Sequence, residues 1–172
     1  MRTKAWLAAG LAAVLVVSAL SAGAQTRTNG AAAPFGQGPG YHDPRSPFKP
    51  LEEKAGVLSW SLLSSVTTKV DKKKLVPQFP TEVAALHQQK VKIQGFMMPL
   101  EPGDRQKHFL LSSVPTSCNF CVPAGPEGLV EVRSLTPVRY TLEPVVVEGV
   151  LAVLKDDPYG LFYRVVEAQP VP

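Results

Sequence analysis

The residues with the clearest capacity for chemistry are the only two cysteines of the chain, Cys118 and Cys121. Their C-x-x-C spacing brings two sulfur atoms onto one tight turn, which suits a disulfide, a soft or borderline metal ion, or thiol–disulfide exchange. Pro115 and Pro123 flank the pair and Gly125 follows it, so we expect the motif on a loop rather than inside a strand. The spacing alone leaves the three chemistries open.

Each of these chemistries has its own requirement. An oxidising compartment favours a disulfide, although closing a four-residue loop stabilises a protein by only roughly 2 kcal/mol. Exchange enzymes of the thioredoxin type place C-x-x-C at a helix N-terminus, where the dipole lowers the thiol pKa, and the prolines and glycine of residues 122–126 cannot build that helix. A metal ion needs a further ligand, for which His108 is the best candidate, although His108 could equally be an outward-facing residue of an edge strand.

The first 24 residues have the organisation of a cleavable signal peptide. Arg2 and Lys4 precede an uncharged apolar run from Ala5 to Leu20, and residues 22–24 are small enough for a signal peptidase. The run is shorter than the roughly 20 residues that comfortably span a bilayer. We therefore expect residues 1–24 to be removed and the remaining protein to work in the periplasm.

The charge of the chain gives no support to nucleic-acid binding. Without Arg2 and Lys4 the 18 basic residues become 16, against 14 acidic ones, so the exported chain is nearly neutral. The only basic run, Lys72-Lys73-Lys74, is typical of a solvated turn and is too short for a phosphate-binding track. We expect no nucleic-acid partner, and the sequence identifies no small-molecule substrate.

Residues 25–54 have the composition of a linker. Glycine, proline, alanine and polar residues dominate this stretch, which cannot bury enough apolar surface to offset its conformational entropy. We therefore expect a flexible Pro/Gly-rich linker at residues 25–54 and a folded domain at residues 55–172.

The folded part has mainly the period-two hydrophobic pattern of β-strands. It is clearest in residues 91–97 and 145–151, where Gly95 and Gly149 occupy equivalent positions and predict sharp bends or close backbone approaches. Further strands are expected at residues 57–66, 108–113, 129–133 and 161–168, with a turn at residues 155–160 and one short helix at residues 81–88. The pattern predicts a mainly β fold, a small curled barrel of five or six strands similar to the oligonucleotide/oligosaccharide-binding (OB) type.

Several segments together resemble an uncharacterised family of exported bacterial domains that is catalogued only as a numbered domain of unknown function. The resemblance runs from about Pro80 to Ala168. It is carried, in order, by residues 91–101 (VKIQGFMMPLE), 109–111 (FLL), the cysteine loop and 128–132 (GLVEV).

The resemblance bears on the cysteines, because the family typically has a Cys-x-His-x-Pro loop and Cys121 stands where a histidine would be. A Cys/His exchange keeps the capacity to bind metal and removes a disulfide. The resemblance also implies a setting, since such domains are often encoded near export or metal-type ABC transporters. It brings no established activity.

The leading hypothesis from the sequence is therefore a non-enzymatic periplasmic accessory protein. Its Cys118/Cys121 loop, with His108, would bind zinc or copper(I) in support of transport or metal homeostasis, with a membrane transporter or another envelope protein as partner. Two alternatives stay open: a thiol–disulfide exchanger that uses Cys118 as the attacking thiol, and an envelope interaction module in which the cysteines form a structural disulfide.

Overall fold

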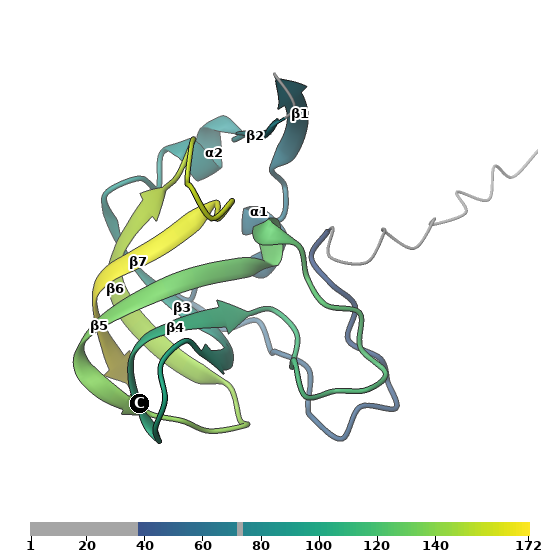
Figure 1. The fold of residues 1–172 in the computed structure, drawn as a ribbon, viewed down its shortest axis with the longest axis vertical. Helices are drawn as coiled ribbons and strands as arrows, with labels where there is room; N and C mark the ends of the chain where they lie inside the picture. Colours follow the sequence, from purple (N-terminus) through teal and green to yellow (C-terminus); the bar gives the residue numbers. More distant parts are fainter. Residues whose placement is uncertain (1–37, 72–73) are drawn as a thin grey trace, which may run out of the picture. The chain divides into compact units, whose positions relative to one another are not determined.

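Five strands form a closed barrel in the computed structural model, which describes residues 38–71 and 74–172 (Figure 1). Around the barrel the order is β3–β4–β5–β7–β6, and β3 pairs with β6 to close it. All neighbouring strands are antiparallel except β5 and β7, which are parallel. The strands are β3 (Gln89–Pro99), β4 (Arg105–Ser112), β5 (Leu129–Arg139), β6 (Val145–Val153) and β7 (Tyr163–Val171). This confirms the predicted mainly β fold with a small OB-like barrel.

Alternating apolar residues produce this barrel because one side of each strand faces its interior. Ile93 and Met97 of β3 are buried there, and Met97 fills the core as its chemistry favours. The two glycines mark close approaches, as predicted. A Cβ atom at Gly149 would lie 2.6 Å from the Val165 side chain, and one at Gly95 would lie 3.0 Å from Leu111. Larger residues at these positions would push neighbouring strands apart.

The part of the chain between residues 57 and 88 differs from the prediction. The prediction of a strand at residues 57–66 is wrong, because a turn of helix, α1 (Trp60–Leu63), forms there. The helix begins where the Ser59 side chain accepts a hydrogen bond from the backbone of Ser61, and its residue Leu63 is buried. The helix expected at residues 81–88 is present but shorter, as α2 (Thr81–Ala84).

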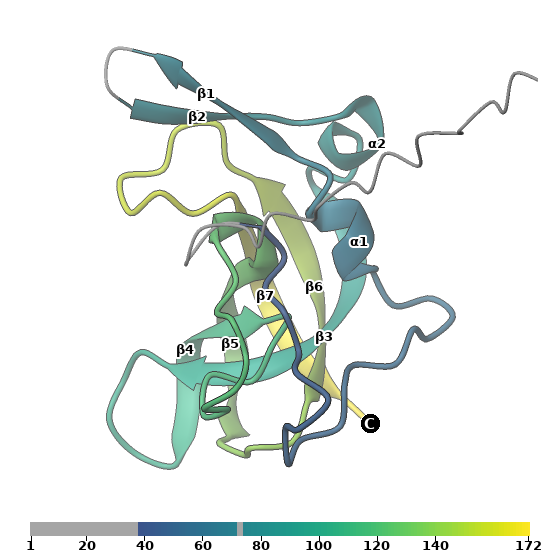
Figure 2. The ribbon, with the colours of Figure 1, turned by 90° about the vertical axis from the view of Figure 1, so that its right-hand side faces the viewer.

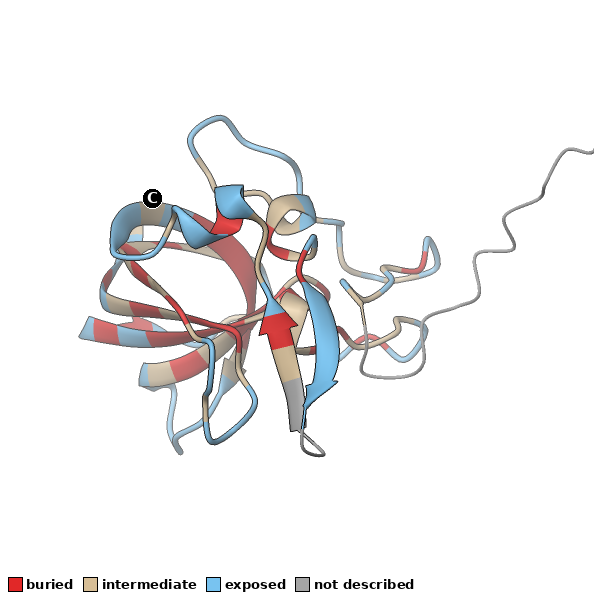
Figure 3. Cartoon of the chain, turned by 90° about the horizontal axis from the view of Figure 1, so that it is seen from above, coloured by how far each residue is buried: buried red, intermediate tan, exposed pale blue. Residues whose placement is uncertain are grey.

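A two-stranded hairpin, which the sequence pattern did not predict, follows α1. It consists of β1 (Thr67–Asp71) and β2 (Lys74–Gln78), and Figure 2 shows it apart from the barrel sheet. Every residue of β1 is exposed, as Figure 3 shows, so the strand has no alternation of apolar and polar residues that could reveal it. Residues 72 and 73 of the basic run lie outside the described residues.

Part of the predicted linker, residues 38–54, is described, and its first residues are hydrogen-bonded to the loop between β4 and β5. Together with residues 55–59 it forms an extended segment, here called the arm, that runs beside the loop between β4 and β5 (Figures 1 and 2). The rest of that linker and the predicted signal peptide lie outside the described residues. Within the described ranges, no helix is long and apolar enough to span a membrane.

Candidate functional site

The two cysteines lie in the loop between β4 and β5, residues 113–128, here called the cysteine loop. Cys118 and Cys121 are joined by a disulfide, with Cα atoms 5.4 Å apart. The backbone is folded back on itself at this point, since the N–H of Cys118 donates to Pro115 and the N–H of Cys121 donates to the carbonyl of Cys118. Cys118 is only 7% exposed. The motif therefore lies on a loop, as predicted, and its sulfur atoms are used in a bridge.

The arm binds directly to the cysteine loop through backbone hydrogen bonds. Tyr41 and Val122 exchange two of them, at 3.0 and 2.9 Å, and the N–H of Gly125 donates to Gly38 at 2.9 Å. Gly40 has φ +78°, and a Cβ atom there would lie 2.9 Å from the carbonyl oxygen of Val122, so this position requires glycine. The arm and the cysteine loop thus form one structural unit, which we call the lobe.

The lobe presents aromatic side chains to solvent. Tyr41 is 53% exposed and Phe120 is 49% exposed, and the guanidinium of Arg45 lies 4.8 Å from the centre of the Phe120 ring. Arg45 is itself held by Asp43, whose pKa is lowered to about 2, chiefly by the hydrogen bond from the Arg45 side chain. The result is an ordered aromatic and cationic surface beside the disulfide.

His108, the predicted third metal ligand, lies in a different place. It is on β4, opposite Arg133 of β5, and its Nε2 is 2.8 Å from Oε1 of Glu131. Arg133 donates to the same oxygen at 3.0 Å, and Arg164 donates to the other carboxylate oxygen and to Asp157. We call this cluster the charged seam, because it joins β4, β5 and β7.

Glu131 is the centre of the charged seam. Its side chain is only 4% exposed. Burial raises the pKa of this carboxyl, but the hydrogen bonds from Arg164, His108 and Arg133 lower it by more, so the net shift is downward. Glu131 is therefore an ionised, fully engaged carboxylate. Nothing in the sequence flagged it, since a glutamate that alternates with valines in a strand is normally taken as solvent-facing.

The predicted ligand set is not brought together in the described part of the chain. Cys118 and Cys121 bond to each other, whereas His108 bonds to Glu131. The described residues contain no group of three histidine, cysteine or acidic side chains with the geometry of a metal site. In the bridged form the cysteines have no thiolate to offer, so what this arrangement can do directly is hold the cysteine loop in shape.

The molecule is thus a small closed β-barrel protein with a disulfide-bridged loop. It belongs to a protein family of unknown function, DUF3299, whose family model matches residues 50–159. A crystal structure of a DUF3299 family protein from Pseudomonas aeruginosa PAO1 is similar to this chain, with 22% sequence identity and a TM-score of 0.39. The match covers 51% of this chain and 64% of that one. No curated protein matches the sequence.

Proposed function

We propose that this protein is a non-enzymatic binding module of the bacterial periplasm, in which the Cys118–Cys121 disulfide keeps the lobe in the shape that a protein partner recognises. One observation carries the proposal. The arm and the cysteine loop, far apart in the sequence, are bound to each other and expose Tyr41, Phe120 and Arg45 together. Tyrosine and arginine are among the residues that contribute most to protein interfaces.

The bridged loop supports this function over metal binding. A thiolate is the form of cysteine that binds zinc or copper(I), and a disulfide has none. His108, which would complete the metal site, is bonded to Glu131 in the charged seam. A metal site at the loop would need reduction of the bridge and a new third ligand.

The surroundings of the bridge also argue against thiol–disulfide exchange. The residues after Cys121 pair with the arm and then form only a 3-10 turn, Pro126–Gly128, so among the described residues no helix N-terminus lies at the motif to lower a thiol pKa. Cys118, the expected attacking thiol, is nearly inaccessible. An exchange enzyme needs a reactive sulfur that its substrate can reach.

The partner that this surface suits is another envelope protein, and the resemblance of the sequence to domains encoded near transporters makes a membrane transporter the first candidate. The exposed ring of Phe120 offers apolar contact area. Arg45 above it offers a cation for an acidic or aromatic partner group. The charged pair with Asp43 holds Arg45 in place, which reduces the entropy lost on binding.

Site-specific photocrosslinking tests the proposal. A photoreactive phenylalanine is placed at Phe120 in the native bacterium, with Tyr159, an aromatic residue 85% exposed on the β6–β7 loop, as the matched control position. We expect one defined protein adduct from position 120 and none from position 159. We also expect the adduct to be lost when Cys118 and Cys121 are both replaced by serine. Adducts of equal yield from both positions, or an adduct that is indifferent to the cysteines, would contradict the proposal.

A further inference from the structure

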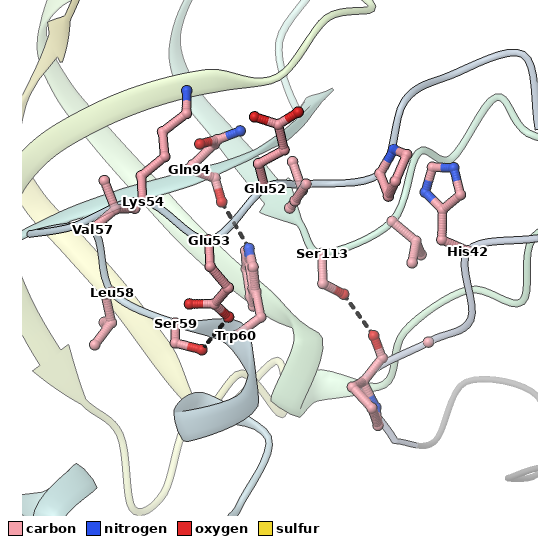
Figure 4. A pocket seen from close by; sticks show the side chains of 15 residues that line it. His42, Glu52, Glu53, Lys54, Val57, Leu58, Ser59, Trp60, Gln94 and Ser113 are labelled. Atoms are coloured by element: carbon pink, nitrogen blue, oxygen red, sulfur yellow. Dashed lines mark hydrogen bonds between the residues drawn. The ribbon is translucent and has the colours of Figure 1, made fainter.

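A pocket of about 250 Å³ lies between the arm and the outer side of β3 (Figure 4). Arm residues such as His42, Glu52 and Glu53 line it together with Trp60 of α1, and Gln94 completes it from β3. Ser113 and Val114, at the start of the cysteine loop, also line it. The disulfide and the exposed Phe120 do not, so the pocket is separate from the binding surface proposed above.

Gln94 is buried without a partner for its side-chain oxygen. The residue is 7% exposed, and Oε1 has no hydrogen-bond partner among the described residues. The backbone carbonyl of Gln94 is already used, since it accepts from the Trp60 indole N–H at 2.7 Å. A buried acceptor left unpaired costs free energy, which a ligand that supplies a donor recovers.

Gln106 on β4 shows what a structural glutamine looks like in the same barrel. It is fully buried, and both ends of its amide are engaged: Nε2 donates to Gly103 at 2.7 Å, and Oε1 accepts from the backbone of Glu101 at 3.4 Å. Gln94 is nearly as buried, yet its Oε1 has no such partner among the described residues. The difference indicates that the Gln94 side chain is placed for something other than the stability of the barrel.

His42 supplies a second unpaired acceptor. Its Nε2 lies 2.9 Å from the carbonyl oxygen of Phe48, which can only accept, so Nε2 carries the hydrogen. In the neutral ring Nδ1 is then an acceptor, and it too is buried without a partner in the described structure. Figure 4 shows Gln94 and His42 well separated along the pocket, with Glu52 between them.

The charges of the pocket favour a cation. Glu52 and Glu53 contribute two carboxylates and Lys54 one ammonium, so with neutral His42 the lining has a formal charge of −1. Glu53 accepts a hydrogen bond from Ser59 at 2.7 Å, which holds its carboxylate at the pocket. Carboxylates together with two unpaired acceptors select a ligand that donates hydrogen bonds and carries positive charge.

From this juxtaposition we propose that the pocket binds a linear aliphatic diamine. One ammonium group donates to Oε1 of Gln94 and the other donates to Nδ1 of His42. The carboxylates of Glu52 and Glu53 balance the two charges, and the methylene chain passes the Trp60 ring. An ammonium group has three donors and no acceptor, which matches a lining whose unpaired buried atoms on Gln94 and His42 both accept.

The fluorescence of Trp60 provides the measurement. The chain has one other tryptophan, Trp6, so the full chain with Trp6→Phe reports on the pocket alone. It is titrated with 1,4-diaminobutane, with 1-aminobutane, which lacks one ammonium, and with 1,4-butanediol, which lacks both charges. We expect a saturable change with the diamine and at least about tenfold weaker binding of the other two, because each loses a charge-assisted hydrogen bond. No saturable change with the diamine, or equal binding of the diol, would overturn the proposal.

Two matched variants identify the site. Gln94→Met removes the unpaired amide at similar volume, so it should weaken diamine binding at least about tenfold while leaving the thermal unfolding midpoint unchanged or higher. Gln106→Met should leave the affinity unchanged. If Gln94→Met fails to fold, His42→Phe, which keeps a ring beside Phe96, must show the same loss of affinity. Diamine binding that survives these substitutions would rule out the site.

Discussion

The charged seam and the lobe are two polar regions of one small barrel, and they are built in opposite ways. In the charged seam, Glu131 is almost fully buried and both of its carboxylate oxygens are engaged by partners on β4, β5 and β7. In the lobe, His42 has a buried acceptor with no partner among the described residues, and so does Gln94 on β3 beside it. The lobe also exposes Tyr41 and Phe120 to solvent.

This difference distinguishes polar groups that stabilise the fold from those available for binding. A buried polar network in which every member is paired holds strands together, and it has no capacity left for a ligand. Unpaired buried acceptors and exposed aromatic rings lower stability or solubility unless a ligand or a partner uses them. The charged seam therefore adds side-chain hydrogen bonds to the backbone pairing of β5 with β7, and the lobe is where we expect recognition.

The largest loss of stability is expected from a substitution in the charged seam. Replacing Glu131 by glutamine removes the carboxylate and leaves Arg164, itself 20% exposed, without its main partner. We expect the free energy of unfolding to fall by about 3 kcal/mol, as for other broken buried ion pairs, measured by urea denaturation. Glu148→Gln, which breaks a more exposed pair with Lys90, is the control and should have a far smaller effect on the free energy of unfolding. Equal losses of stability in the two variants would contradict the structural role of Glu131.

The next effect concerns the disulfide and should be local to the lobe. Replacing both Cys118 and Cys121 by serine should lower the free energy of unfolding by roughly 2 kcal/mol, because the bridge closes only a short loop. Hydrogen exchange should become faster at the amides of Tyr41 and Val122, which pair the arm with the cysteine loop. The amide of Val147, in the β6 strand of the barrel, serves as the control. Unchanged exchange at Tyr41 and Val122 would show that the bridge does not support the arm.

A smaller difference in the free energy of unfolding is expected between variants of the two buried glutamines. Gln106→Met should lower the free energy of unfolding by about 1.5 kcal/mol because two hydrogen bonds are lost, whereas Gln94→Met should leave it nearly unchanged. Urea denaturation of the two variants, without any ligand, measures the difference. A Gln94→Met protein that is as unstable as Gln106→Met would mean that Gln94 is an ordinary structural residue.

The smallest effect is the change with pH in the contribution of the charged seam to stability. Because the native pKa of Glu131 is lowered below its ordinary value of 4.5, its contribution to stability is fully present well above pH 4.5 and is lost as pH falls through the native pKa. The stability difference between the wild-type protein and Glu131→Gln should therefore be constant near neutrality and shrink in acid. Denaturation at several pH values tests this. If the stability difference between the two proteins grew below pH 4.5, the lowered pKa of Glu131 would be contradicted.

The sequence predicts a region when the contacts that determine its structure lie between residues close in the chain, and fails when they do not. Alternation within β3 and β6, and the glycines in both, predicted the barrel because strand pattern and tight packing act over a few residues. The partner of His108 depends on the register between β4 and β5, which no local pattern contains. The arm has the composition of a linker, yet Tyr41 is ordered by Val122 far along the chain. Both polar regions were therefore beyond prediction, although Cys118 and Cys121 were correctly placed on a loop.

The central claim is that the cysteine loop is a bridged, structural part of a binding lobe. Native mass spectrometry of the purified protein, with and without reductant, tests it most directly. The account predicts a metal-free mass two hydrogens below that of the reduced chain, with the two hydrogens regained when reductant opens the Cys118–Cys121 bridge. A reduced chain that carries zinc or copper, and loses it on Cys118→Ser, would contradict the account and identify the cysteine loop as a metal site.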